Sequence, residues 1–310
     1  MADIKQHSLL YAKGIAMGAA DVVPGVSGGT IAFLTGIYEE LLSSIKSVGP
    51  GSIKILFSQG PKACWASING NFLLVLLLGI GTSIVSLARV ITHLLTTYPT
   101  LLWSFFFGLI LVSSLYMVRQ IKGWGPQNVA SLLIGAVIAY TITILSPSEI
   151  EATPITIFLA GSVAICAMIL PGISGSFILL LLGMYSHIMG AIKAFDMDIL
   201  AVFAVGCITG LLLFSRFLSW LLARYHEVTM ALLTGFMLGS LNKVWPWKQT
   251  LEWRENSHGV QVPLTQENLS PFSYAEILGQ DHQLAYCLGL AILAIVIVLG
   301  IEQIASRKVD

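Results

Sequence analysis

Two apolar segments of the sequence are interrupted by the same motif, Pro-Gly-x-Ser-Gly. The first copy begins at Pro24 and the second at Pro171. Proline and glycine interrupt a helix, and the residues after each motif predict a new helix. The free N–H groups and positive dipole end of such a helix attract anions, phosphate above all. The motif therefore predicts a phosphate site formed by Ser27, Gly28, Gly29 and Thr30 in the first copy and Ser174, Gly175 and Ser176 in the second.

The surroundings of the motifs bear on this interpretation. Irregular backbone inside a membrane is tolerated only where protein or a water-filled cavity surrounds it, so we expect both turns to line a cavity. The alternative is that the small residues only allow close helix packing, as in many membrane bundles. The use of the whole motif at equivalent places favours binding over packing alone.

Two arginines lie in apolar segments at equivalent positions, Arg89 and Arg216. A charge in such a segment is costly and indicates function by default, and a guanidinium group can bind phosphate through two hydrogen bonds. Both are predicted to contact the phosphate group. The alternative is that each side chain extends to the lipid headgroups at a nearby helix end.

Asp21 and Glu39 flank the first motif, whereas Met168 and Ser186 occupy the corresponding places in the second half. This asymmetry predicts a coupling site for a proton or sodium ion. An ion pair or a solvated helix cap is an equally good interpretation of these two carboxylates.

Other kinds of chemistry find little support in the sequence. The four cysteines and six histidines show no ligand spacing, so no metal or other cofactor is expected. No phosphate-binding loop of the ATPase type is present, so any energy would come from a gradient. A net charge of zero gives no basic face for nucleic acid.

The composition indicates that the segments carrying these residues lie in a lipid bilayer. Hydrophobic residues make up 56% of the chain, charged residues 10%, and the mean hydropathy is +0.84. Six segments are long and apolar enough to cross a bilayer. They are residues 71–95, 100–118, 128–146, 199–223, 228–245 and 284–304.

The chain also contains an internal repeat. At an offset of 147, positions 24–46 and 171–193 share 10 identities in 23 positions. Further along, an offset of 127 pairs Gly79 with Gly206 and Arg89 with Arg216. Residues 1–146 and 147–310 are therefore predicted to be two repeats of one transmembrane domain.

The arms beside each motif are too short to span a bilayer, so residues 9–45 and 155–192 are predicted to be re-entrant hairpins. Each repeat then has three crossings, and the repeats are inverted. Fourteen of the sixteen Lys and Arg residues lie outside the predicted spans or near their ends, and this topology places ten of them on the cytoplasmic side, in agreement with the positive-inside rule. The predicted fold is an all-α membrane protein with two inverted repeats, cytoplasmic termini, and residues 246–283 outside.

Around the motifs, the sequence resembles the polyprenyl-phosphate transporter family of the PopT type, formerly a bacterial membrane domain of unknown function. The resemblance rests on residues 18–30, 36–39, 171–176 and 183–185. It implies that the chain flips undecaprenyl phosphate from the outer to the inner leaflet of the bacterial cytoplasmic membrane, recycling the carrier lipid of envelope synthesis. The identity of the lipid substrate is inferred from the resemblance alone.

Two other functions use similar elements. Undecaprenyl-diphosphate phosphatase also has inverted repeats and a Pro-Gly-x-Ser turn, but Gly28 and Gly175 stand where its arginine would be. Glu39 and Glu40 do not give its ExxxE spacing, so a transporter is predicted and not an enzyme. A transporter or channel for a small anion is the remaining alternative, and an oligomer is compatible with any of these.

Overall fold

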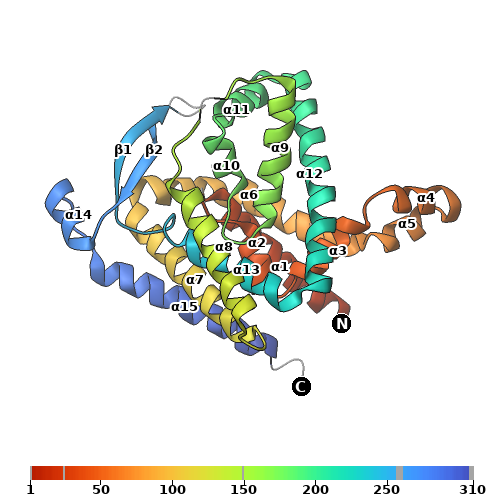
Figure 1. Cartoon of the computed structure of the whole chain (residues 1–310), viewed down its shortest axis with the longest axis horizontal. Helices are drawn as coiled ribbons and strands as arrows, with labels where there is room; N and C mark the ends of the chain where they lie inside the picture. The colour runs from red at the N-terminus through yellow and green to blue at the C-terminus, as the bar shows by residue number, and fades with distance from the viewer. Residues whose placement is uncertain (1, 24, 149, 256–260, 307–310) are drawn as a thin grey trace.

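The protein is a helical membrane protein with one β-hairpin (Figure 1). The computed structural model describes residues 2–23, 25–148, 150–255 and 261–306, so Pro24 of the first motif lies outside the described residues. About 78% of these described residues are helical. The predicted all-α membrane class is confirmed, with the hairpin as an addition.

The described residues of the first half form eight helices. Three form the interrupted segment, α1 (Ala2–Val22), α2 (Gly28–Leu34) and α3 (Tyr38–Ser47). Two short helices follow, α4 (Pro50–Gln59) and α5 (Pro61–Ser67), which stand away from the main body in Figure 1. Three long helices complete the half, α6 (Gly70–Thr97), α7 (Pro99–Gln120) and α8 (Pro126–Ile144).

The second half begins in the same way. Its interrupted segment consists of α9 (Pro154–Ile169), α10 (Gly175–Leu181) and α11 (Tyr185–Ala194). The next helices are α12 (Met197–Arg224) and α13 (His226–Ser240). The antiparallel strands β1 (Lys248–Glu255) and β2 (Gln261–Asn268) follow, with α14 (Pro271–Leu278) and α15 (Leu284–Ser306) after them.

The arms of the interrupted segments differ from the prediction. We expected a single helix after each motif, but a glycine in the left-handed region divides it into a helix of 7 residues and one of 10. Gly36 has φ +70° and Gly183 has φ +69°, which a residue with a side chain rarely adopts. In the second half, the two pieces meet at an angle of 109°.

The predicted spans correspond to helices of unequal length. In the described part of the chain, four helices are long and apolar enough to cross a membrane, namely α6, α7, α8 and α12, and the bent α10–α11 pair makes five if it is one span. Helix α13 ends at Ser240, short of the predicted boundary at 245, because the chain turns there toward the β-hairpin. The protein is therefore a multi-pass membrane protein.

Four helix pairs form the main contacts, two within the halves and two between them. Helix α1 lies along α6 and α9 lies along α12, while α7 pairs with α15 and α8 with α13 across the halves. Gly14 and Gly79 contact the opposite backbone where α1 and α6 cross, and Gly161 and Gly206 do so where α9 and α12 cross. These glycines are equivalent at the offsets of 147 and 127, so the same close contacts occur in both halves.

Candidate functional site

The two motifs lie against each other in the interior. The Ser27 hydroxyl donates to the Met168 carbonyl at 2.8 Å, just before the second motif. In the opposite direction, the Gly172 N–H donates to the Thr30 hydroxyl at 2.9 Å. Two segments about 140 residues apart are thus joined by two hydrogen bonds.

The N–H groups of the first turn have acceptors within the protein. The Gly28 N–H donates to a carboxylate oxygen of Asp21 at 2.7 Å, and the Gly29 N–H donates to the Ser27 hydroxyl at 3.0 Å. The Thr30 N–H donates to the Ser27 carbonyl at 3.0 Å. In this arrangement, Asp21 lies where we expected an anion, so these four residues form a helix cap and a joint. Their contact with a substrate stays a prediction.

The second turn is arranged differently. Ser174 stands at the N-cap of α10 without a side-chain cap bond, and its hydroxyl lies 2.9 Å from that of Ser176. Gly172 and Ser174 both line a small pocket. Gly175 packs tightly against the Ala164 carbonyl of α9. Of the two turns, the second offers a hydroxyl group, that of Ser174, at a pocket wall.

Lys243 joins the two turns at this pocket. A Cβ atom at Gly25, where φ is +91°, would lie 2.8 Å from Lys243 Cγ, so the lysine side chain passes directly over the first turn. Its ammonium lies 4.2 Å from the centre of the Phe177 ring in α10. Lys243 was not among the predicted site residues, and its place at the end of the apolar segment 228–245 was the available signal.

A larger cavity of about 390 Å³ adjoins this pocket, since Lys243 and Phe177 line both. Its polar wall includes Thr143, Asn242, Lys248 and Gln266. Apolar side chains lie at its edge, where Leu145 and Leu251 are each 53% exposed. The cavity therefore combines cationic and polar groups with an apolar opening. The apolar edge is formed by Tyr140, Ile144, Leu145 and Leu251.

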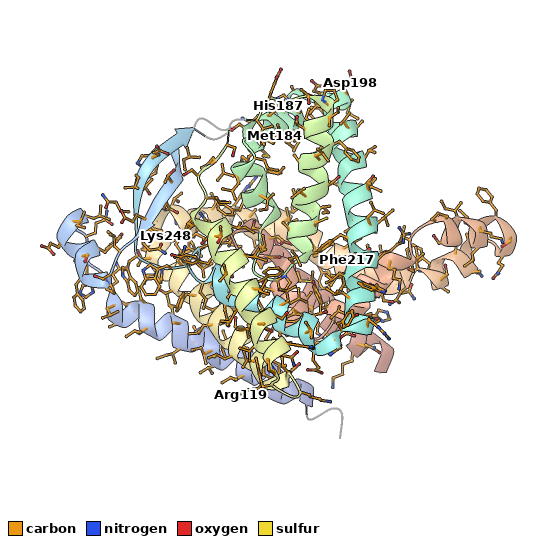
Figure 2. All side chains as sticks on the ribbon, in the orientation of Figure 1. Arg119, Met184, His187, Asp198, Phe217 and Lys248 are labelled. Atoms are coloured by element: carbon orange, nitrogen blue, oxygen red, sulfur yellow. The ribbon has the colours of Figure 1, made fainter. Side chains whose placement is uncertain are left out.

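Lys248 contributes a second ammonium to this cavity. It lies where the β-hairpin meets the helices (Figure 2), and its ammonium donates to the Lys243 carbonyl. The ammonium also lies 4.4 Å from the centre of the Trp103 ring in α7. Burial, and secondly the neighbouring Lys243 charge, lower the pKa of Lys248 well below the usual lysine value. An anion that enters the cavity would stabilise the charged form of Lys248.

The two arginines are placed elsewhere. Arg216 donates from its guanidinium to the Val48 carbonyl at 3.1 Å and to the Leu212 carbonyl at 3.4 Å, so it connects α12 to the end of α3. Arg89 is exposed on α6. Neither is among the described residues that line the cavity. Their predicted contact with a phosphate group stays untested.

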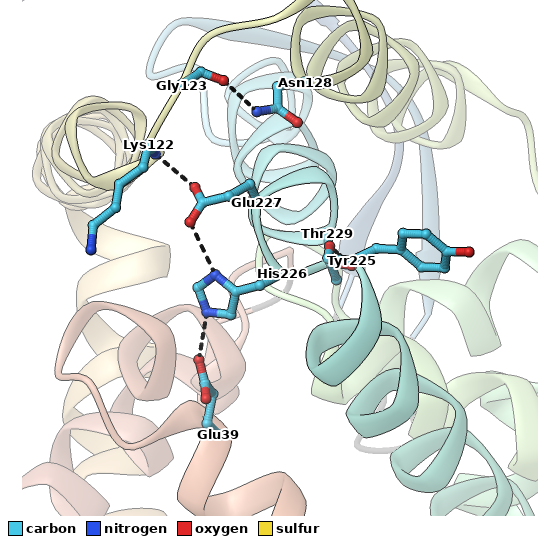
Figure 3. A network of polar contacts seen from close by, with 8 residues as sticks. All are labelled: Glu39, Lys122, Gly123, Asn128, Tyr225, His226, Glu227 and Thr229. Atoms are coloured by element: carbon cyan, nitrogen blue, oxygen red, sulfur yellow. Dashed lines mark hydrogen bonds and ion pairs between the residues drawn. The ribbon is translucent and has the colours of Figure 1, made fainter.

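The two acidic candidates are separated as well. Asp21 caps α2, whereas Glu39 is exposed at the start of α3 and lies 3.1 Å from His226 Nε2 (Figure 3). His226 also approaches Glu227, whose carboxylate accepts the Lys122 N–H at 2.7 Å. Glu39 thus belongs to a network that connects the two halves, and its role in ion coupling stays a prediction.

The arrangement is suited to binding a phosphate group. Ammonium and hydroxyl groups converge on one cavity, where they can neutralise and orient an oxyanion. Among the residues that the structure describes, no three His, Cys, Asp or Glu side chains are grouped to hold a metal ion.

Comparison with known proteins agrees with this chemistry. A polyprenyl-phosphate transporter of Vibrio cholerae serotype O1 is 55% identical over 297 residues, which cover 96% of each chain. A polyprenyl-phosphate transporter of Staphylococcus aureus is 32% identical over 255 residues, covering 76% of this chain and 84% of that protein. No solved structure matches. The model of the undecaprenyl phosphate translocase-like family (VCA0040-like) matches residues 17–262, and with these relatives it shows that the chain belongs to that family.

Proposed function

We propose that this protein moves polyprenyl phosphate from the outer to the inner leaflet of the bacterial cytoplasmic membrane, returning the carrier lipid of envelope synthesis for reuse. The observation that carries the proposal is the cavity, because it places the Lys243 ammonium beside the second turn and exposed apolar side chains at the opening. A phosphate group would bind at Lys243 and Ser174, while the isoprenoid tail remains against the apolar edge.

The position of the cavity supports the direction of transport. It lies beside the β-hairpin, which the charge distribution predicts to be outside. Arg119 is one of the ten basic residues that the predicted topology places on the cytoplasmic side, and it lies at the lower edge of the molecule in Figure 2, away from the β-hairpin. In our proposal, the repeats are inverted, both termini are cytoplasmic, and the joined motifs exchange access between the two leaflets.

A leaflet-exposure assay tests the proposal. Proteoliposomes would contain a short polyprenyl monophosphate with a fluorescent tail, and an added membrane-impermeant phosphatase would report how much lipid faces outward. Protein should make nearly all of the lipid accessible over time, whereas Lys243→Gln should slow this exchange at least tenfold. Exchange no faster than in protein-free vesicles would contradict the proposal.

The same vesicles address the two alternatives. In vesicles that carry the corresponding polyprenyl diphosphate, release of inorganic phosphate without the added enzyme would indicate a diphosphate phosphatase. Entry of inorganic phosphate without lipid exchange would indicate a small-anion transporter. The apolar opening favours the lipid. A small anion has no apolar surface to bury against the exposed Leu145 and Leu251 side chains, so they would not contribute to its binding.

A further inference from the structure

The β-hairpin contributes a cation to the same cavity as the helices. Lys243 follows α13, Lys248 begins β1, and both side chains line the 390 Å³ cavity. Within the described part of the chain, neither ammonium forms an ion pair with a carboxylate. Glu267 also lines the cavity, but its side chain is exposed on β2. The polar wall thus has two cations without a bound counter-charge.

Both ammonium groups are held in place by aromatic rings from different helices. Lys243 lies over Phe177 of α10, and Lys248 lies over Trp103 of α7. Two like charges in a poorly solvated space repel each other, and an anion between them would remove that repulsion. An anionic ligand in this cavity would therefore stabilise the arrangement.

The base of the hairpin is fixed, so Lys248 cannot move away freely. Asn268 donates to the carbonyl and side-chain oxygens of Asn242, each at 2.9 Å. Asn242 in turn donates to the Thr143 hydroxyl of α8 at 2.7 Å. The Leu269 N–H donates to the Trp247 carbonyl at 2.9 Å. These bonds close the base of the hairpin and connect the end of β2 to α8 beside the cavity, which preorganises the second cation.

On the basis of the proposed function, we propose that Lys248 is a specificity residue that, with Lys243, selects a phosphate monoester over a phosphodiester. A monoester carries about −1.5 to −2 charges near neutral pH and has three terminal oxygens. Two ammonium groups can balance that charge. The diester headgroups of ordinary phospholipids carry one negative phosphate charge and a second substituent, so they gain less from the second lysine. The hairpin is then part of the binding site and not a passive cover.

The test compares two ligands on purified protein in detergent. Farnesyl phosphate is the monoester, and its methyl diester has the same tail with one less charge. Affinities would be measured by calorimetry, with thermal unfolding to verify that each variant is folded. Lys248→Gln should weaken monoester binding about tenfold, the effect of losing one charged contact, and leave diester binding nearly unchanged. Lys248→Arg should recover part of the preference because it keeps the charge.

Lys193→Gln is the matched control, since this lysine is exposed at the end of α11 and should not alter either affinity. If folded Lys248→Gln keeps the wild-type ratio of the two affinities, the inference is wrong. If Lys243→Gln weakens monoester binding while Lys248→Gln does not, the proposed function stands and only the role of the hairpin fails. If wild-type protein binds neither ligand, both proposals fail together.

Discussion

The Ser27 hydroxyl donates to the Met168 carbonyl at 2.8 Å, although the two residues are 141 positions apart. The same hydroxyl accepts the Gly29 N–H, so one side chain caps α2 and joins it to α9. The first motif therefore depends on the second half for its structure. Any exchange of access between leaflets that separates the two motifs would have to break this contact.

Ser27→Ala should lower the free energy of unfolding by about 1–2 kcal/mol, because it removes both a helix cap and a buried hydrogen bond. Thermal unfolding in detergent would measure the loss. Ser58→Ala is the control, since the exposed Ser58 hydroxyl bonds to the Lys54 carbonyl within α4. Equal melting temperatures for Ser27→Ala and wild type would show that the joint contributes no stability.

Gly29→Ala should be far more damaging than its small size suggests. A Cβ atom at Gly29 would lie 2.5 Å from the Ile169 carbonyl, so α2 would have to move away from α9. We expect the free energy of unfolding to fall by roughly 2 kcal/mol or more, so that less of the variant folds in the membrane. Gly51→Ala in α4 adds its Cβ to open space and should leave the melting temperature unchanged or higher. Similar behaviour of both variants would contradict the close contact.

Arg216→Ala should lower stability by about 1 kcal/mol through loss of the bond to the Val48 carbonyl, while farnesyl phosphate affinity stays the same. Thermal unfolding and calorimetry separate the two effects. The opposite pattern, weaker binding at unchanged stability, would support the predicted contact with the phosphate group. Arg89→Ala tests the same prediction on an exposed side chain and should leave stability unchanged.

Asp21→Asn and Glu39→Gln form a matched test of ion coupling. Asparagine can keep the acceptor for the Gly28 N–H, so Asp21→Asn should fold while losing the titratable group. If Asp21 carries the coupling ion, this variant should lose the pH or sodium dependence of lipid exchange in proteoliposomes. Glu39→Gln should retain that dependence, because Glu39 is exposed and lies beside His226. An unchanged dependence in Asp21→Asn would remove this residue from coupling.

Lys248→Met should stabilise the ligand-free protein by roughly 1 kcal/mol at neutral pH, because it removes a desolvated cation. Burial lowers the Lys248 pKa in the folded protein, so the unfolded chain binds more protons and wild-type stability should rise with pH. The advantage of the variant should therefore shrink as the pH approaches the usual lysine value of 10.5. Thermal unfolding between pH 7 and about 10.5 would measure it; a destabilised variant would contradict the argument.

Much of the fold follows from local features of the sequence. Long apolar segments require helices in a bilayer, and the interruption at each motif follows from proline and glycine. The repeat also predicted which glycines are equivalent, and Gly79 and Gly206 occupy equivalent helix crossings. The division of each second arm at Gly36 and Gly183 was missed, because a single glycine does not reveal its φ angle.

The residues around the cavity could not be assigned in this way. The sequence alone determined a membrane protein with two equivalent interruptions and free helix ends inside it. Only the tertiary structure decided that Asp21 and Ser27 occupy the first of these ends, and that Lys243 and Lys248 converge on the cavity beside the second. The physical reason is that helix formation depends on near neighbours, whereas the partner of a buried polar group is set by segments more than a hundred residues away.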